Sequence, residues 1–320
     1  MSIRLIALDL DGTLLNSKKE LTERNRKALE NCIAQGIWIV PCTGRTSKGI
    51  PDFVRGIPGV RYAITVNGGM IEDMEESKVL DEHLLKKETA LELIDLVKNR
   101  HIMYDAYIGG QGISEDKFYN HLEDYRITPE IQMLVKKTRI MVPSIVEYVK
   151  KWNGMIDKVN YFFDDLEERQ EIWELLKQKD DILVSTSLYN NLEINGPGAS
   201  KGEGLLRLAS MLGIRREETM AFGDGNNDAS MIRDAGIGVV MENGDPDLKG
   251  IADYITATND ESGVAQAIEK LGRDCGWRVF TWDGIIWPLS GIYPSGSIHV
   301  CSGGYFCNRK SGNAQGVYLY

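Results

Sequence analysis

The chain of 320 residues carries 37 Lys and Arg against 47 Asp and Glu, which gives a formal net charge of -10 at pH 7. This length suffices for one large or two modest domains, and 42% hydrophobic with 26% charged residues are typical of a globular rather than a disordered protein. The acidic balance argues against a general nucleic-acid binder, which needs a basic face, but leaves room for a small anionic ligand bound locally.

The first residues of the chain form a short apolar run that is interrupted by Asp9 and Asp11. Such a run is too short and too acidic for a signal peptide or a membrane span. The five cysteines are scattered without a Cys-x-x-Cys pair, and Cys32 and Cys42 lie in apolar, core-like surroundings. The sequence therefore predicts a reduced, cytoplasmic protein that has no membrane partner.

The first 83 residues alternate between strand-like and helix-like segments. Ile3 to Leu8 is an apolar run typical of a buried strand, and a helix follows it with Thr22 as N-cap and Gly36 just past its end. Ile37 to Cys42 and Ala63 to Val66 are predicted as the next two strands. Strands that alternate with helices form parallel β-α-β units, in which ligands bind at the carboxyl ends of the strands.

The pattern changes between residues 84 and 189 and then returns. In this insert we predict helices at Lys87 to Arg100 and Leu166 to Lys179, and strands at Ile102 to Ile108, Lys158 to Phe163 and Ile182 to Thr186. The β-α-β rhythm resumes with segments at Asn191 to Asn195, Thr219 to Phe222, Ala229 to Asp234, Ile237 to Val240 and Ser262 to Leu271. The order predicts an α/β core of residues 1–83 and 190–271 with an α/β module, residues 84–189, inserted into it.

Residues 272–320 differ in composition from the rest of the chain. They contain no Glu but three of the five Cys and three of the six Trp, and they show no clear helical period. An appended segment, a disordered tail and the translation of a shifted or fused reading frame are the open explanations. The loss of Glu and the gain of Gly, Cys and Trp favour the last of them, and we assign this tail no function.

Two aspartates follow the first predicted strand, in the sequence Asp9-Leu10-Asp11-Gly12-Thr13. Side chains at i and i+2 point the same way on an extended backbone, and Gly12 permits a sharp turn, so both carboxylates are expected at the edge of the sheet. Unpaired buried charge is costly, which leaves no packing reason to end a buried strand in two Asp. The alternative is a solvated turn, in which Asp and Gly are common.

A second acidic turn, residues 223–228 with the sequence Gly-Asp-Gly-Asn-Asn-Asp, also follows a predicted strand directly. Its glycines permit a tight strand-to-helix turn, and Asp224 and Asp228 supply hard oxygen ligands suited to Mg2+. The alternative is an Asx turn in which Asp228 serves as a helix N-cap. Together the two motifs would bring four carboxylates to one edge of the sheet, where they repel each other unless a cation or raised pKa values compensate.

Two further positions are candidates for binding a phosphate group. Thr43 follows the second strand in Cys-Thr-Gly-Arg, so its hydroxyl and nearby backbone N–H groups, including that of Gly44, could bind an anion. Lys201 follows a Gly-Pro-Gly-Ala-Ser run and opens a predicted helix, and a cation beside a helix N-terminus is typical of an anion site. Taken alone, each is also consistent with an ordinary solvated residue.

In order and spacing these motifs resemble the haloacid dehalogenase-like phosphatases. The residues that carry the resemblance are Asp-x-Asp-Gly-Thr, then Thr-Gly-Arg, then Asn-Gly-Gly, then a lysine, and last Gly-Asp-Gly-x-Asn-Asp. The resemblance covers about residues 1–271, and the long insert is similar to the α/β cap of the Cof-type branch. It implies a Rossmann-like core whose cap, residues 84–189, sets substrate specificity.

The resemblance also implies an activity and a role for each candidate residue. It implies Mg2+-dependent hydrolysis of small phosphorylated metabolites, such as sugar phosphates, with Asp9 as the nucleophile and Asp11 as general acid and then base. The phosphoryl oxygens would be held by Thr43, Gly44, Lys201 and Asn227. The metal site would be formed by Asp9, Asp11 through its backbone carbonyl, Asp224 and, in support, Asp228.

Two other functions remain open from the sequence. A phosphotransferase or mutase of the same superfamily would need a cap that excludes water and retains a bisphosphate. A non-catalytic sensor of phosphate ligands would not need the full set of acids and the lysine. No position in the cap indicates a particular substrate, and nothing in the sequence indicates an oligomeric state.

Overall fold

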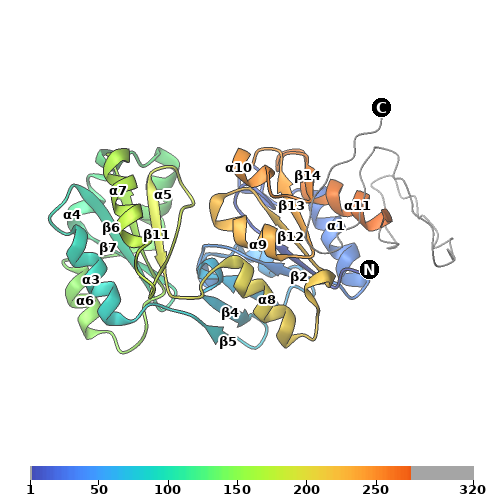
Figure 1. The fold of residues 1–320 in the computed structure, drawn as a ribbon, viewed down its shortest axis with the longest axis horizontal. Helices are drawn as coiled ribbons and strands as arrows, with labels where there is room; N and C mark the ends of the chain where they lie inside the picture. The colour runs from blue at the N-terminus through green and yellow to red at the C-terminus, as the bar shows by residue number, and fades with distance from the viewer. Residues whose placement is uncertain (1, 275–320) are drawn as a thin grey trace. The chain divides into compact units, whose positions relative to one another are not determined.

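The computed structural model describes residues 2–274 of the chain (Figure 1). The strands are β1 (Leu5–Leu8), β2 (Trp38–Pro41), β3 (Tyr62–Thr65), β4 (Met70–Asp73), β5 (Lys78–Glu82), β6 (Ile102–Ile108), β7 (Gln111–Glu115), β8 (Arg139–Val142), β9 (Lys158–Phe163), β10 (Leu183–Ser185), β11 (Asn191–Asn195), β12 (Thr219–Gly223), β13 (Ile237–Met241) and β14 (Tyr254–Thr256).

The helices are named in the same chain order. The α-helices are α1 (Glu23–Ala34), α2 (Asp52–Arg55), α3 (Lys87–Val97), α4 (Asp116–Tyr119), α5 (Pro129–Thr138), α6 (Ile145–Lys151), α7 (Leu166–Leu176), α8 (Lys201–Met211), α9 (Ala229–Asp234), α10 (Pro246–Lys249) and α11 (Gly263–Asp274). Short 3-10 helices are η1 (Ser47–Gly49), η2 (Val66–Gly68), η3 (Leu122–Tyr125), η4 (Arg216–Glu218) and η5 (Asn226–Asp228).

The core sheet has five parallel strands in the order β14-β13-β12-β1-β2, which confirms the predicted α/β core. In its register, Leu8 at the end of β1 lies opposite Phe222 of β12 and Pro41 of β2. The residues that follow these three strands therefore begin at the same edge of the sheet. This is the edge where the sequence predicts the site.

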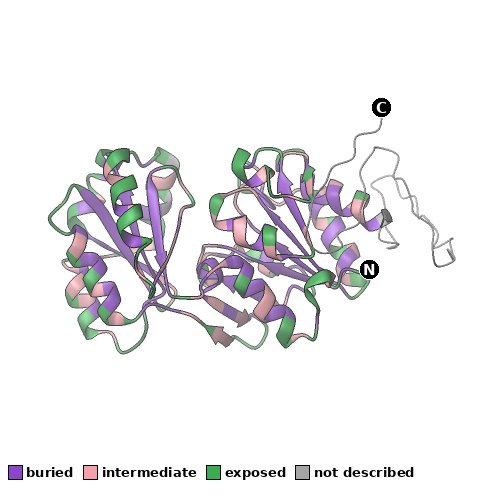
Figure 2. Cartoon of the chain, in the orientation of Figure 1, coloured by how far each residue is buried: buried purple, intermediate pink, exposed green. Residues whose placement is uncertain are grey.

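Helices cover both faces of the core sheet. Leu5 and Ala7 of β1 belong to one apolar cluster with residues of α8 and α9, while Ile6 and Leu8 belong to another with residues of α1 and α11. Successive side chains of a strand point to opposite faces, so β1 is buried on both sides, as Figure 2 shows for the central strands. The predicted N-cap of α1 is confirmed, because the side chain of Thr22 accepts a hydrogen bond from the backbone N–H of Asn25.

The third predicted core strand is wrong in its pairing. Instead of joining the parallel sheet as a fully paired strand, β3 pairs antiparallel with β4, which pairs antiparallel with β5. Beside β2 it makes one parallel bridge, between Cys42 and Ile64, and the ring of Tyr62 packs against that of Trp38. The reason lies in the turn after β3, where Val66 and Asn67 have left-handed φ values of 53° and 55° and reverse the chain. The sequence analysis did not predict β4 or β5.

The inserted residues form a separate six-stranded sheet in the order β10-β11-β9-β6-β7-β8. Helices α3, α6 and α7 contribute to the apolar cluster on one of its faces. The expected start of the second core segment at residue 190 is wrong, because β11 pairs with β9 and β10 rather than with the core. Leu192 and Ile194 of β11 are fully buried in the apolar cluster of this sheet, which is what holds the strand there.

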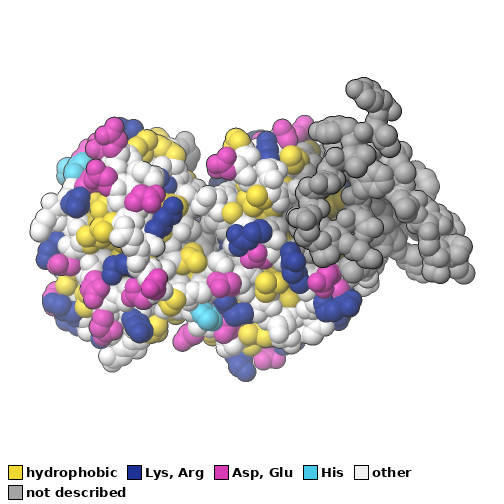
Figure 3. Space-filling view, in the orientation of Figure 1, with side chains coloured by type: hydrophobic (Ala, Val, Ile, Leu, Met, Phe, Trp, Pro, Cys, Tyr) yellow, Lys and Arg dark blue, Asp and Glu magenta, His cyan; other side chains and the backbone are white. Residues whose placement is uncertain are grey.

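Two sequence predictions concern the surface and the end of the chain. On the face shown in Figure 3, acidic and basic side chains are interspersed, without the gathered basic patch that nucleic acid requires. No helix in the range 2–274 combines the length and the apolar character that crossing a bilayer demands. The tail expected at residues 272–320 lies outside the described residues, apart from the last residues of α11.

Candidate active site

The two aspartate motifs of the sequence pack directly against each other at the carboxyl edge of the core sheet. Gly12 has a φ of +84°, and a Cβ on it would lie 2.3 Å from Oδ2 of Asp224. The neighbouring hydroxyl of Thr13 donates a hydrogen bond to Oδ1 of Asp224 at 2.6 Å. Glycine at position 12 is therefore required both for the turn and for the close approach of the second motif.

Lys201 links the two motifs electrostatically. It is the first residue of α8, whose N-cap Ser200 accepts a hydrogen bond from the backbone of Glu203. Its Nζ donates to Oδ1 of Asp9 at 2.6 Å and to Oδ1 of Asp228 at 2.5 Å, and the lysine side chain is 0% exposed. The two carboxylates raise the pKa of Lys201 above its ordinary value although burial acts to lower it, so the ammonium stays charged.

Asp228 stands at the N-cap position of α9, as the alternative interpretation of this turn has it, but not as a side-chain cap. Its side chain makes no capping hydrogen bond to α9. Instead, Oδ2 accepts from the backbone N–H groups of Asp224 and Gly225, both at 2.9 Å, while Oδ1 accepts from Lys201. Both oxygens of Asp228 are thus used to shape the loop and to hold the lysine.

Three carboxylates of this cluster have the arrangement of a metal site. Asp9, Asp224 and Asp228 each place one oxygen in a group whose atoms all lie within 4.8 Å of one another. Because Asp228 already uses both oxygens, Asp9 and Asp224 are the members with oxygens left to give. Carboxylate oxygens are hard donors, and one or two carboxylates are what a small divalent cation such as Mg2+ typically takes from a protein.

The pKa values of the cluster indicate a shortage of positive charge. Burial raises the pKa of Asp9 well above its ordinary value, although Lys201 counteracts the shift. The pKa of Asp224 is raised to about 6, mainly by burial and secondly by the negative charge of Asp228. A divalent cation beside these two carboxylates would offset both the burial and the mutual repulsion that raise their pKa values.

Asp11 lies near enough for its charge to raise the pKa of Asp9 and Asp224, but its side chain is not part of the three-carboxylate cluster. Its side chain is 36% exposed and forms two hydrogen bonds with Arg45, from Nε at 2.7 Å and from Nη2 at 2.8 Å. Lys19 donates a third, at 2.8 Å. Burial acts to raise the pKa of Asp11, but the hydrogen bonds and charges of Arg45 and Lys19 outweigh it and lower the pKa.

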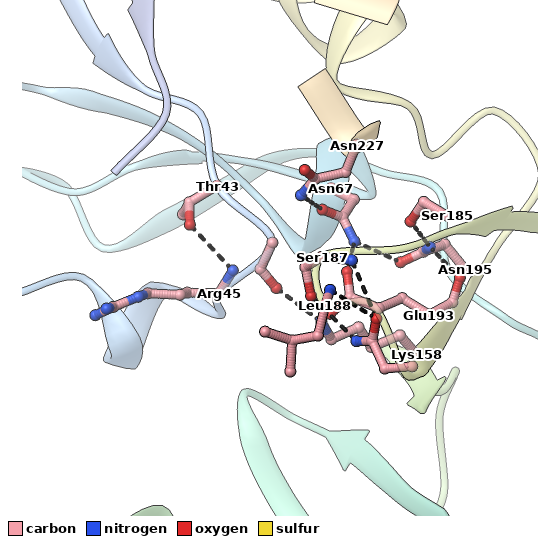
Figure 4. A network of polar contacts seen from close by, with 12 residues as sticks. Thr43, Arg45, Asn67, Lys158, Ser185, Ser187, Leu188, Glu193, Asn195 and Asn227 are labelled. Atoms are coloured by element: carbon pink, nitrogen blue, oxygen red, sulfur yellow. Dashed lines mark hydrogen bonds and ion pairs between the residues drawn. The ribbon is translucent and has the colours of Figure 1, made fainter. Parts of the chain in front are cut away.

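The candidate phosphate-binding residues Thr43, Gly44 and Asn227 all lie next to Asn67, and Figure 4 shows the side chain of Asn227 beside that of Asn67. The backbone N–H of Asn67 donates to the carbonyl of Thr43 at 3.1 Å, and Nδ2 of Asn227 donates to Oδ1 of Asn67 at 3.1 Å. A Cβ on Gly44 would lie 2.7 Å from Oδ1 of Asn67, so this position also needs glycine. The structure thus brings the Thr43-Gly44 turn, Asn67 and Asn227 together from three distant parts of the sequence.

The sequence analysis missed four residues that contact the site. Arg45 and Lys19 bind Asp11, while Lys158 and Glu193 contact Gly44 and Asn67 from the sheet of the inserted module. A signal for the last two was present, since each is a charged residue inside a short strand that is otherwise predicted as buried. A charge at such a position requires a buried partner.

Comparisons with known proteins agree on one family. The profile described as haloacid dehalogenase-like hydrolase matches residues 6–268. The phosphatase YwpJ of Bacillus subtilis is 32% identical over 286 residues, which cover 84% of this chain and 100% of that protein. The 5-amino-6-(5-phospho-D-ribitylamino)uracil phosphatase YcsE of the same organism is 30% identical over 268 residues, covering 84% and 95%. A solved haloacid dehalogenase-like hydrolase from B. subtilis has a TM-score of 0.74 at 30% identity, covering 84% and 100%.

Proposed function

The chain belongs to the haloacid dehalogenase-like hydrolases and is a phosphatase, and on that premise we propose that it hydrolyses small phosphomonoesters with Mg2+ through a phosphorylated Asp9. The observation that carries the proposal is the buried Lys201, which holds Asp9 and Asp228 beside Asp224 at the carboxyl edge of the core sheet. A carboxylate held by a lysine at such an edge has its position and charge set for attack on a phosphate.

In the first step, a carboxylate oxygen of Asp9 forms a bond to phosphorus as the bond from phosphorus to the alkoxide oxygen breaks. Asp11 gives its proton to the departing alkoxide. In the second step, water attacks the aspartyl phosphate, its proton passes to Asp11, and the bond between Asp9 and phosphorus breaks. Arg45 and Lys19 favour the ionised Asp11 that this second step requires. The negative charge of a substrate phosphate nearby would raise its pKa for the first.

The chain offers ligands for both the metal and the phosphate. Asp9, Asp224 and the backbone carbonyl of Asp11 would hold Mg2+, which when bound would supply positive charge against the phosphoryl oxygens. Lys201, the hydroxyl of Thr43, the backbone of Gly44 and the amide of Asn227 would hold the phosphoryl group. The raised pKa values of Asp9 and Asp224 support the metal assignment, because they show that two of its ligands lack a full countercharge.

The sheet of the inserted module supports a polar organic leaving group, such as that of a sugar phosphate. Asp105 of β6 lies opposite Ser114 of β7 on one side and Asn160 of β9 on the other, and all three are buried. Within the described part of the chain, Asp105 Oδ1, Ser114 Oγ and Asn160 Oδ1 have no hydrogen-bond partner. Unpaired buried acceptors are costly, and hydroxyl groups of a substrate would satisfy them. The relative YcsE is likewise named for a phosphorylated small molecule with a polyol group.

Phosphate release from a panel of sugar phosphates and an aryl phosphate tests the proposed function. We expect release in the presence of Mg2+ and its loss in EDTA, because the carboxylate cluster then lacks the cation that neutralises it. Analysis of the organic product separates the alternatives. An isomerised sugar phosphate without free phosphate would establish a mutase, and binding without any turnover would establish a sensor.

The Mg2+ requirement is expected to depend on pH. Since the pKa of Asp224 is raised to about 6, this carboxylate is ionised and free to bind metal above that pH and is protonated below it. The Mg2+ concentration for half-maximal activity should be constant above about pH 7 and rise by up to about tenfold per pH unit below about pH 6. Mg2+ titrations across this range, with circular dichroism to verify folding at each pH, provide the measurement. A half-maximal concentration that stays constant down to pH 5 would contradict the assignment of Asp224.

A further inference from the structure

A buried ion pair lies outside the carboxylate cluster, on neighbouring strands of the six-stranded sheet. Lys158 of β9 and Glu193 of β11 join through Nζ and Oε1 at 2.8 Å, and their side chains are only 3% and 7% exposed. Burial acts to raise the pKa of Glu193, but the charge and hydrogen bond of Lys158, together with a hydrogen bond from Asn67, lower it below the ordinary value. Glu193 is therefore ionised.

Each member of the pair also makes a hydrogen bond to a residue of the core (Figure 4). Nζ of Lys158 donates to the backbone carbonyl of Gly44 at 3.0 Å. Oε2 of Glu193 accepts from Nδ2 of Asn67 at 2.7 Å. A buried pair offsets its desolvation only when such additional hydrogen bonds are made, and here both of them reach residues that surround the proposed phosphate site.

The ionised Glu193 determines which way the amide of Asn67 faces. A carboxylate can only accept hydrogen bonds, so Asn67 has to present Nδ2 to it and Oδ1 to the opposite side. The backbone of Asn67 is held in the left-handed region, with φ 55° and ψ 32°, and its N–H is bound to Thr43, so the side chain has little freedom to move as a whole. Nδ2 of Asn67 also makes a longer hydrogen bond to Oδ1 of Asn195, at 3.4 Å, but the shorter bond to the ionised Glu193 is the main determinant of the amide's orientation.

The orientation of Asn67 in turn determines that of Asn227. Oδ1 of Asn67 accepts from Nδ2 of Asn227 at 3.1 Å, which leaves Oδ1 of Asn227 on the side of Gly225. An amide nitrogen carries two hydrogens, and Asn67 uses one of them. The second N–H of Asn227 is then free to donate to a phosphoryl oxygen. With the amide reversed, an oxygen would occupy that place and repel the anion.

We infer that Glu193, charged through its pairing with Lys158, is a positioning residue that orients Asn67 and thereby turns an N–H of Asn227 toward the phosphoryl group. The inference rests on the proposed function in one respect, the binding of phosphate beside Asn227. It adds to that function a residue of the inserted module on which phosphate binding depends. Lys158 has two tasks in this arrangement, to keep Glu193 ionised and to hold the carbonyl of Gly44.

An exchange of the amide and the carboxylate tests the inference. In Glu193→Gln, the new amide faces Lys158 with its oxygen and Asn67 with its NH2 group. The side-chain amides of Asn67 and Asn227 then have to exchange the positions of their oxygen and nitrogen atoms. In Asn67→Asp, two carboxylates face each other in a buried site. We expect each single variant to weaken the binding of inorganic phosphate, and to raise KM for an aryl phosphate, by about ten- to hundredfold with a smaller change in kcat.

The double variant Asn67→Asp with Glu193→Gln is expected to recover most of the loss. Oε1 of the glutamine accepts from Lys158, its Nε2 donates to the new aspartate, and that aspartate accepts from Asn227, with the total charge of the group unchanged. Calorimetry of inorganic phosphate needs no turnover, so its outcome is distinct from a failure of the wild type to release phosphate. A double variant that binds phosphate no better than the weaker single variant would overturn the inference.

Two further variants separate orientation from folding. Ser185→Ala removes a hydroxyl that binds Asn195 in the neighbouring strand but does not contact Asn67 or Gly44, and it should bind phosphate as the wild type does. Glu193→Asp shortens the side chain but keeps a group that only accepts hydrogen bonds. It should therefore retain more phosphate affinity than Glu193→Gln, although glutamine is the closer match to glutamate in size. The reverse order, or an unchanged phosphate affinity in Glu193→Gln, would show that the charge of Glu193 does not orient the site.

Discussion

Asp9→Asn is expected to lower phosphate release by at least about a thousandfold while the protein stays folded. The amide has nearly the shape of the carboxylate and its oxygen can still accept the hydrogen bond of Lys201, but it is no nucleophile toward phosphorus. The raised pKa of Asp9 shows that the folded, metal-free protein disfavours the charge at this position. In EDTA at neutral pH, the thermal midpoint of the variant should therefore equal or exceed that of the wild type.

The measurement combines steady-state release from an aryl phosphate with thermal unfolding in EDTA. Asp11→Asn is the matched control, since it makes the same chemical change two residues away but keeps the nucleophile. We expect this control to retain the ability to transfer a phosphoryl group to Asp9 in a single turnover, which Asp9→Asn should lack. If Asp9→Asn kept more than about a tenth of the wild-type activity, Asp9 would not be the nucleophile.

The parts of the fold that sequence reasoning predicted are those that local pattern determines. Ile3 to Leu8 is apolar without interruption because β1 is covered on both faces, and the segment predicted at Thr219 to Phe222 matches β12 for the same reason. The bounds of β6 and β9 also match the prediction. In each case the burial of the strand can be seen in its own residues.

The errors concern partners that lie far away in the sequence. Asn191 to Asn195 was correctly predicted as a strand, but nothing local indicates that it pairs with β9 rather than with the core. Asp11 was expected with Asp9 at the edge of the sheet, but nothing local indicates that Arg45 and Lys19 bind its carboxylate there. A residue's charge partner, like a strand's neighbour, is set by the tertiary fold, and a single sequence carries no direct record of it.

In the candidate site too, residues in local motifs could be predicted, whereas residues defined by contacts distant in sequence could not. The motifs that contain Asp9, Thr43, Lys201 and Asp224 could be recognised because each follows a strand or opens a helix. Glu193 could not be assigned, because its significance comes from contacts with Lys158 and Asn67, which are distant in sequence. The residues proposed to contact the substrate or the metal belong to sequence motifs. A residue that only orients other side chains is recognised from its contacts in the structure.

Lys201→Met is expected to abolish activity and to destabilise the metal-free protein by about 3–5 kcal/mol at neutral pH. The substitution keeps an unbranched side chain of similar length in a fully buried position but removes the charge that both Asp9 and Asp228 share. Without it, the two carboxylates repel each other in a buried site. Their pKa values should rise further, because only protonation can then neutralise them.

The sign of the pH dependence distinguishes this explanation from a simple loss of packing. A carboxyl group with a raised pKa in the folded state destabilises the protein above that pKa and ceases to do so as the pH falls through it. The deficit of Lys201→Met in denaturant unfolding with EDTA should thus shrink between about pH 7.5 and pH 5. Mg2+ should shrink it at pH 7.5 as well, because the ion replaces part of the missing charge. Lys19→Met, which removes an exposed lysine from Asp11, is the control and should change stability by less than about 1 kcal/mol. A deficit in Lys201→Met that is independent of both pH and Mg2+ would mean that the lysine acts through packing and not through charge.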